Sequence, residues 1–424
     1  MEKIGKYRVI RKLGEGATSE VYLCHDPFAD REVAIKVVFP DSLTDDENRK
    51  LFRKLFVTEA SLAGKLTHPH IVQIYDAVVD EGISYVVMEY VDGGTLEPHC
   101  NMQALLPVER IVEIIFKCTR ALDFANRAGV IHRDIKPANI LLHGETDIKI
   151  SDFGSALITT SMVTQVSGIG SPAYMSPQQI KEHPLTLQTD IYSLGVVMYQ
   201  LLSGQLPFQA TNNFSMMYQI TNVEPQPPSS LRPDIAPAVD HIVRMAMQKE
   251  LEQRYQNWDE FSNDLSAVIS DDQVQKKEAF ADSEKFNILR ALPFFAHFSD
   301  AELWEVMRIS GWEYCKPGKP LMFDGETGDF FCLLASGEVK VIKQGKLLNI
   351  LNAGECFGEM AYVSREKGSV RSADVVALSE SRVITIHNED LDRASDVCRH
   401  KFDRAFMAIL VERLSLSNTR LIGV

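Results

Sequence analysis

The chain has 424 residues, of which 45% are hydrophobic and 24% charged, and its formal net charge at pH 7 is −14. This composition is typical of a globular protein, and the length favours about two or three domains over a single core. The negative charge and the lack of a lysine and arginine cluster exclude a broad nucleic-acid-binding face, so we expect no nucleic-acid partner.

The cysteines and the apolar segments predict the cellular compartment of the protein. Seven cysteines are scattered along the chain, and none forms a C-x-x-C pair. An odd, dispersed set disfavours a disulfide framework or a zinc site and favours a reducing compartment. The first ten residues lack the apolar core of a signal peptide, and the most apolar helical stretch, residues 192–204, is too short to span a bilayer. We therefore expect a cytoplasmic protein without a membrane partner.

The first 85 residues or so are predicted to form strands with one helix. Residues 7–16 and 19–26 alternate like a hairpin, and residues 31–38 follow as a third strand. Residues 48–66 have helical spacing, whereas residues 83–91 are again strand-like.

The rest of the chain changes character twice. From about 105 to 268 the pattern is mostly helical, and residues 270–286 are charged and poor in large apolar side chains, which favours a helical connector. Residues 328–360 read as short strands separated by glycines, typical of a small barrel or roll. The tail is predicted to be helical with Asn388 as its N-cap. Its apolar residues recur at helical spacing, which predicts a stripe that packs on the barrel: Leu391, Val397, Phe406, Ile409 and Leu414.

Two polar motifs interrupt the helical region. "HRDIKPAN" spans residues 132–139, and "DFG" spans residues 152–154 after a strand-like stretch. A solvated turn would explain either motif alone, but not both in this order. Upstream, "GEGATSEV" (14–21) lies between two strands, and a glycine-rich hairpin lets backbone N–H groups approach phosphate oxygens. Lys36 lies in an apolar strand, and Glu59 on the next helix could pair with it.

In their order and spacing, these motifs resemble the signature set of eukaryotic-like protein kinases over about residues 7–268. "GEGATSEV" and "GSPAYMSPQQ" (170–179) are most similar to the bacterial serine/threonine kinases, although Ser19 replaces the third loop glycine. The resemblance implies an α+β, bilobal kinase fold over residues 1–268. It also implies a serine/threonine protein kinase that uses ATP and Mg²⁺ on a protein substrate.

The resemblance assigns roles to individual residues. Lys36, positioned by Glu59, would hold the α- and β-phosphates, Asp134 would accept the substrate hydroxyl proton, and Lys136 would neutralise the γ-phosphoryl group. Asn139 and Asp152 would hold Mg²⁺ through oxygen ligands. The remaining nucleotide-binding residues would be Leu13, Gly14, Gly16, Val21, Ala34, Leu141 and the backbone of Glu89 and Val91.

The same resemblance predicts contacts that support the catalytic motif and a means of regulating it. Gln178 stands where the family carries a glutamate that pairs with an arginine, here Arg254, so a neutral hydrogen bond is expected. Asp190 matches the residue that braces the catalytic loop. Arg133 before Asp134 is typical of kinases that await activation-loop phosphorylation, with Thr164 and Ser167 as candidate sites. A flexible loop rich in serine and threonine is the alternative explanation of that segment.

The C-terminal segment contains a candidate anion site. A short helix is expected after Gly358, whose amides would meet a phosphate, while Arg371 would neutralise it and Glu359 would accept from a ribose hydroxyl. Residues 286–424 resemble the cyclic-nucleotide-binding domain of the cAMP receptor protein and of cyclic-nucleotide-dependent kinases. The resemblance implies a helical linker (269–285), a cupin-like jelly roll (286–388) with flanking helices, and a C-terminal helix (389–424).

The sensor segment departs from its family in two places. The spacing from Glu359 to Arg371 is longer than the common pattern, and Asp374 stands where an acidic group would oppose phosphate binding. Ser372 is compatible with either cAMP or cGMP. We therefore carry two hypotheses: a kinase regulated in cis by a cyclic nucleotide, and a signalling scaffold whose barrel recruits partners. The C-terminal helix is a candidate lid and a candidate homodimer contact.

Overall fold

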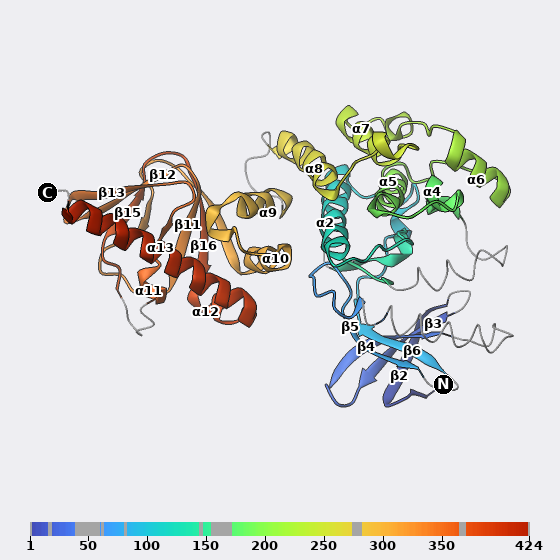
Figure 1. The fold of residues 1–424 in the computed structure, drawn as a ribbon, viewed down its shortest axis with the longest axis horizontal. Helices are drawn as coiled ribbons and strands as arrows, with labels where there is room; N and C mark the ends of the chain where they lie inside the picture. Colours follow the sequence, from blue (N-terminus) through green and yellow to red (C-terminus); the bar gives the residue numbers. More distant parts are fainter. Residues whose placement is uncertain are drawn as a thin grey trace. The chain divides into compact units, whose positions relative to one another are not determined.

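The computed structural model describes residues 2–15, 19–38, 60, 63–79, 83–143, 147–153, 172–273, 282–363 and 370–422. The chain divides into two compact units, Met1–Lys277 and Glu278–Val424 (Figure 1). The predicted linker over residues 269–285 contains the end of helix α8 (Trp258–Gln273) and the start of α9 (Asp282–Ala291). Residues 274–281 lie outside the described residues.

The first unit begins with a six-stranded antiparallel sheet in the order β1-β2-β3-β4-β6-β5. The strands predicted over residues 7–16, 19–26, 31–38 and 83–91 are confirmed, and the helix predicted over 48–66 falls mostly outside the described residues. The strands are β1 (Lys3–Ile4), β2 (Tyr7–Glu15), β3 (Ser19–Asp26), β4 (Arg31–Val38), β5 (Ile74–Val79) and β6 (Ser84–Glu89).

Strand β4 lies inside this sheet, and its side chains alternate between a buried apolar face and the opposite face, which carries Lys36. Val33, Ile35 and Val37 are fully buried in the cluster that covers one face. Because successive side chains of a strand point to opposite faces, Ala34 and Lys36 lie on the other face. Lys36 pairs with Val21 of β3 and with Val86 of β6, so the sheet holds it on both sides.

Helices make up most of the remainder of the first unit (Figure 1). Helix α5 carries the apolar stretch noted in the sequence; the Thr186 hydroxyl caps its start, and Gly204, with a φ of 74°, ends it. A two-stranded hairpin, β7 (Ile140–His143) and β8 (Asp147–Ile150), separates the two polar motifs. The helices are α2 (Val108–Arg127), α4 (Pro177–Ile180), α5 (Leu187–Ser203), α6 (Asn213–Asn222), α7 (Pro237–Ala246) and α8.

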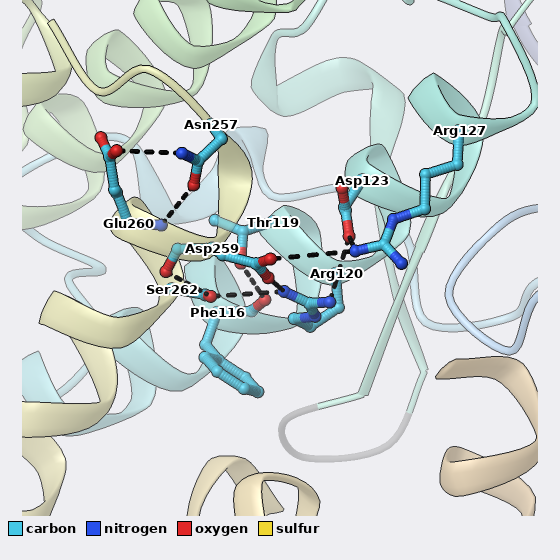
Figure 2. Close-up of polar contacts among 9 residues, drawn as sticks. All are labelled: Phe116, Thr119, Arg120, Asp123, Arg127, Asn257, Asp259, Glu260 and Ser262. Carbon is cyan, nitrogen blue, oxygen red and sulfur yellow. Dashed lines mark hydrogen bonds and ion pairs between the residues drawn. The ribbon is translucent and has the colours of Figure 1, made fainter. Parts of the chain in front are cut away.

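Figure 2 shows how buried polar contacts join α2 to α8. Arg120 of α2 is 1% exposed, and its guanidinium donates to Asp259 (2.8 Å), to Ser262 (3.3 Å) and to Asp123 (3.1 Å). Arg127 pairs with the same Asp123 carboxylate at 2.7 Å. A buried guanidinium is tolerated when its donors are satisfied, and losing one partner of such a pair is costly. The contacts therefore hold α8 on α2.

The second unit is a roll of two four-stranded antiparallel sheets, ordered β10-β15-β12-β13 and β14-β11-β16-β9 among the described residues. Every strand contributes to one buried apolar cluster, from Cys315 of β9 to Val383 of β16. The predicted roll is confirmed. Its strands are β9 (Ser310–Cys315), β10 (Pro320–Met322), β11 (Phe330–Ser336), β12 (Glu338–Lys343), β13 (Lys346–Asn352), β14 (Cys356–Phe357), β15 (Asp374–Ala377) and β16 (Ser381–His387).

Helices flank the roll. They are α9, α10 (Asp300–Ile309), α11 (Met360–Val363), α12 (Asn388–Asp392) and α13 (Asp396–Ile422). Phe402 and Phe406 of α13 pack on Phe331 of β11, with ring centroids 5.9 and 4.9 Å away. Phe402 also contacts Phe298 at 5.2 Å. Aromatic packing therefore fixes α13 on the roll.

Two predictions for the tail are wrong. It forms two helices rather than one, and His387, not Asn388, occupies the N-cap position of the first. Ser395 starts the second helix: its hydroxyl accepts from Cys398 N (3.2 Å) and donates to Glu305 of α10 (2.7 Å). A serine followed by an acidic residue is a start signal that the sequence contained.

The predicted apolar stripe is only partly correct. Leu391 and Phe406 are buried, but Val397 is 59% exposed, because the break at Ser395 changes the face that α13 presents. Ile409 is half-buried, and the side chain of Leu414 lies outside the described residues. Phe402, which was not predicted, is fully buried. Among the described residues, no helix has both the length and the apolarity needed to cross a membrane.

Candidate active site

The "HRD" residues form a loop that a buried carboxylate holds in place. Asp190 of α5 is 3% exposed, and its two oxygens accept from the backbone N–H groups of His132 and Arg133, both at 2.7 Å. Burial raises the pKa of Asp190, whereas the two N–H donors favour its charged form. Arg133 has a φ of 66°, a conformation that non-glycine residues adopt only when their surroundings impose it. Asp190 thus braces the loop as the resemblance implies.

Asp134, directly after this brace, is contacted by two of the predicted site residues. Nζ of Lys136 lies 2.8 Å from Oδ2 of Asp134, and Nδ2 of Asn139 donates to the same oxygen at 3.1 Å. Nδ2 of Asn139 also donates to the Asp134 carbonyl at 2.8 Å. Among the described residues, the side-chain donors Lys136 and Asn139 both contact Oδ2 of Asp134. Oδ1 of Asp134 is therefore the oxygen that can accept a proton.

Asp152, the acidic residue of the second motif, pairs with Lys36. Nζ of Lys36 donates to Oδ1 of Asp152 at 2.7 Å, and both side chains are mostly buried. Burial opposes ionisation of Asp152, but Lys36, through its charge and hydrogen bond, together with His132 and Lys136, holds the pKa of this carboxyl below its ordinary value. The pair joins the sheet to the segment after β8.

The two predicted metal ligands are brought together by the main chain. Ser151 donates from its N–H (2.9 Å) and its hydroxyl (3.3 Å) to the Asn139 carbonyl, so Asp152 directly follows a residue bound to Asn139. His132 bonds the Ser151 carbonyl at 2.8 Å and packs against Phe153. The Asn139 nitrogen already donates to Asp134, so its oxygen is the group available to a cation.

This donor set fits Mg²⁺. A hard cation takes one or two carboxylates plus neutral oxygens, phosphates and water, so it requires no cage of protein ligands. Among the described residues no three histidine, cysteine, aspartate or glutamate side chains gather as a metal site. Asp152 and Asn139 supply the oxygens that such a shared site needs.

The predicted nucleotide-binding residues that the structure describes lie in or next to strands, and most of them are at least half-buried. Gly14 pairs with Val21 across β2 and β3, next to a register shift between Lys12 and Gly14. Ala34 is 7% exposed, whereas Leu13, Val21, Leu141, Glu89 and Val91 are half-buried. The predicted residues that lie outside the described part of the chain are Gly16, Glu59, Thr164 and Ser167.

The predicted contact between Gln178 and Arg254 is confirmed. Both terminal nitrogens of Arg254, which is 1% exposed, lie 3.1 Å from Oε1 of Gln178, and burial lowers the pKa of Arg254 to about 10. The carbonyl groups of Gln188, Gln248 and Lys249 accept its other hydrogen bonds. The neutral amide of Gln178 therefore takes the place of the family's glutamate, and main-chain carbonyls accept the remaining hydrogen bonds of Arg254.

In the second unit, Arg371 lies where the candidate phosphate site was expected. It is 6% exposed, donates to the carbonyls of Gly358 (2.8 Å) and Phe330, and stacks 4.6 Å from the Phe330 ring. Gly358 has a φ of 79°, and a Cβ there would lie 2.7 Å from Arg371 Nη1 and 2.5 Å from Met322 Cε. Glycine is therefore required for this approach, and the predicted short helix follows as α11.

The other predicted sensor residues differ in burial. Glu359 is 2% exposed at the start of α11, whereas Ser372 is exposed. Asp374 has a structural contact that was not predicted: its Oδ1 accepts from the backbone N–H of Asp324 at 2.8 Å, which stabilises a turn. Its effect on phosphate binding stays a prediction. The stacking partner Phe330 was not predicted, because nothing in the sequence separates it from other apolar strand residues.

Comparisons with known proteins match two parts of the chain to domain families. The protein kinase domain model matches residues 7–265, more than half of the chain. The chain belongs to the protein kinase family. The cyclic nucleotide-binding domain model matches residues 312–396, so the kinase unit is followed by a sensor-type domain, as the resemblance implied.

Bacterial serine/threonine kinases are among its relatives. The chain is 37% identical over 273 residues to a probable serine/threonine-protein kinase of Streptomyces coelicolor, 36% over 296 to PknB of Mycolicibacterium smegmatis, and 34% over 293 to PrkC of Bacillus subtilis. The alignments cover 62%, 68% and 68% of this chain and 40%, 47% and 44% of those relatives. The matched part thus spans less than half of their length.

Proposed function

We propose that this protein transfers the γ-phosphoryl group of ATP to serine or threonine hydroxyls of a protein substrate. The observation that carries the proposal is the convergence of five side chains from three segments: Lys36 on Asp152, and Lys136 and Asn139 on Asp134. Phosphoryl transfer requires positioning and charge neutralisation, and these side chains can supply both.

Each residue has a role that follows from its contacts. Oδ1 of Asp134 would accept the hydroxyl proton, since Lys136 and Asn139 occupy Oδ2. Lys36 would exchange part of its contact with Asp152 for phosphate oxygens. Asp152 and Asn139 would hold Mg²⁺, which neutralises charge on the phosphates. Ala34, Val21 and Leu141 would pack around the base, with Glu59 and Gly16 completing the site.

Phosphorylation of the activation loop would regulate this site. Nε of Arg133 is buried and has no acceptor among the described residues. A phosphate on Thr164 or Ser167 would give it a charge-assisted partner and would order the loop next to Asp134. Both hydroxyls lie outside the described residues.

A cyclic nucleotide, cAMP or cGMP, is the proposed ligand of the second unit. Its phosphate would take donors of Arg371 and the amides after Gly358, and Glu359 and Ser372 would contact the ribose and base. The hydroxyl of Tyr362 in α11 donates to Asp403 of α13 at 3.3 Å, and its ring packs on Phe406, so a movement of α11 can reach α13. Val397, Met407 and Val411 leave an exposed apolar line on α13, which supports a homodimer contact there.

The cytoplasm is the proposed compartment. No disulfide joins the seven cysteines, all of which lie within the described residues, and burial raises the pKa of most of their thiols. Buried single thiols are typical of proteins in reducing surroundings.

The test is phosphate transfer from radiolabelled ATP with Mg²⁺ to the chain itself and to a general protein acceptor. Asp134→Asn should reduce transfer by at least about a hundredfold, because the proton acceptor is lost. Asp234→Asn is the matched control: it makes the same carboxylate-to-amide change at an exposed residue that pairs with Arg232, and it should leave the rate unchanged. Transfer at the wild-type rate in Asp134→Asn would contradict the role given to Asp134. Transfer that is undetectable in wild type would favour the scaffold hypothesis.

A further inference from the structure

Glu89 and Lys149 form an ion pair that none of these roles uses. Nζ of Lys149 lies 3.0 Å from Oε2 of Glu89, and the side chains are 15% and 26% exposed, respectively. Glu89 is the last residue of β6, just before the segment that leads to Val91, and Lys149 lies in β8. The two strands belong to different sheets of the kinase unit, so the pair ties one sheet to the other.

The main chain reinforces the position of Glu89. The N–H of Gln73 donates to Oε2 of Glu89 at 3.2 Å, and the N–H of Glu89 donates to the Gln73 carbonyl at 2.8 Å. One carboxylate oxygen thus accepts from a cation and from a backbone amide, and charge-assisted hydrogen bonds of this kind are the stronger ones. Glu89 is held through its side chain and through its backbone.

Lys149 lies near two residues of the proposed site, the nucleotide contact Leu141 and the Mg²⁺ ligand Asp152. It is directly opposite Leu141 in the β7–β8 register, and it precedes Asp152 by three residues. Its neighbour Ile150 donates to the His70 carbonyl and accepts from Val72 N, both at 2.9 Å. Residues 70–73 therefore contact β8 and also contact Glu89 through Gln73. The contacts form one block that includes the end of β6, Leu141 and the strand that leads to Asp152.

We infer that the Glu89–Lys149 pair positions the backbone of residues 89–91 over Leu141 and thereby sets the affinity for ATP and the preference for adenine over guanine. The inference rests on the proposed function for the identity of the nucleotide. Adenine presents an amino donor where guanine presents an oxygen acceptor, so a rigid backbone pattern rejects guanine by leaving polar groups unpaired. Glu89 and Lys149 are positioning residues: a backbone that shifts distinguishes the bases less well.

The test measures Kd for ATP and for GTP by calorimetry on the full chain, together with KM and kcat. In Glu89→Gln, Kd and KM for ATP should rise about tenfold, since one partner of a half-buried charge pair is lost. The Kd for GTP should change much less, so the ratio of Kd for GTP to Kd for ATP should fall. The kcat should stay within about twofold of the wild-type value. Asp30→Asn makes the same change at a carboxylate that is 94% exposed in the turn between β3 and β4. It should change neither the ratio of the two Kd values nor kcat.

Further variants separate positioning from general stability. Lys149→Met should reproduce the effect of Glu89→Gln, and the double variant should be no worse than either one, because the two residues act as a unit. Lys149→Arg keeps the charge and should retain most of the adenine preference. If Lys149→Met lowers the melting temperature, Lys149→Arg is the variant that tests the positioning role. Equal losses for ATP and GTP, a fall in kcat alone, or additive single effects would overturn the inference. A wild type that binds ATP without transferring phosphate would overturn the proposed function only.

Discussion

At the scale of single residues, Lys249 shows how burial makes a charge conditional on pH. Its ammonium donates to the Ile220 carbonyl at 2.7 Å and lies 4.5 Å from the centroid of the Phe208 ring, and burial lowers its pKa from 10.5 to about 8. A base whose pKa is lower in the folded state binds fewer protons there than when unfolded. The free energy of unfolding should therefore rise between pH 8 and pH 10.5, by ~1–3 kcal/mol.

Chemical unfolding at several pH values checks this expectation. Lys249→Met removes the titrating group and should flatten the rise, whereas Lys181→Met, at an exposed lysine of the same unit, should keep it. All other ionisable groups are shared by wild type and Lys249→Met, so the difference between their slopes isolates Lys249. An identical slope in wild type and Lys249→Met would contradict the explanation.

At the scale of elements, α13 is held by aromatic rings rather than by an apolar stripe along its whole length. Phe402 is fully buried and contacts Phe294, Phe298 and Phe331 at ring distances of 5.2 to 5.9 Å. Phe402→Ala would leave a cavity between three elements that cannot all close on it. The expected loss of stability in the sensor unit is about 3–5 kcal/mol.

Hydrogen exchange can place this loss within the chain. Amides of α13 should exchange much faster in Phe402→Ala, and amides of α5, in the other compact unit, serve as the internal reference and should not change. Arg404→Ala truncates an exposed side chain on the same helix and should cost less than about 0.5 kcal/mol. Faster exchange in α5, or none in α13, would contradict the role given to Phe402.

At the scale of the whole molecule, the proposed regulation requires the sensor ligand to change the kinase rate. Wild type should show a different rate of phosphate transfer when cAMP or cGMP is added. Arg371→Ala should lose both nucleotide binding and the rate change. Tyr362→Phe should still bind the nucleotide, but its rate of phosphate transfer should change less, because the hydroxyl that bonds Asp403 is removed.

Calorimetric binding beside rate measurements distinguishes these outcomes. Leu378→Ala, at a partly exposed position of the same roll, is the control and should bind and respond as wild type does. Arg371→Ala that binds nucleotide normally would show that the guanidinium serves only its bonds to Gly358 and Phe330. A full response in Tyr362→Phe would exclude the Asp403 contact as the route of coupling.

Local patterns determined much of this protein in advance. Alternation with a period of two predicts β2, β3, β4 and β6, because successive side chains of a strand must face opposite sides. The motif residues, the glycine turns of the roll and the exchange of glutamate for Gln178 were also readable, since each depends on a residue type at a fixed spacing.

Tertiary structure decided what depends on contacts between distant segments. The Glu89–Lys149 pair joins residues 60 positions apart, Asp374 accepts from the backbone N–H of Asp324, and Arg371 donates to the carbonyls of Gly358 and Phe330. The break at Ser395 depends on Glu305 of another helix. A side chain's partner depends on which elements pack against it, so spacing along one segment cannot specify it.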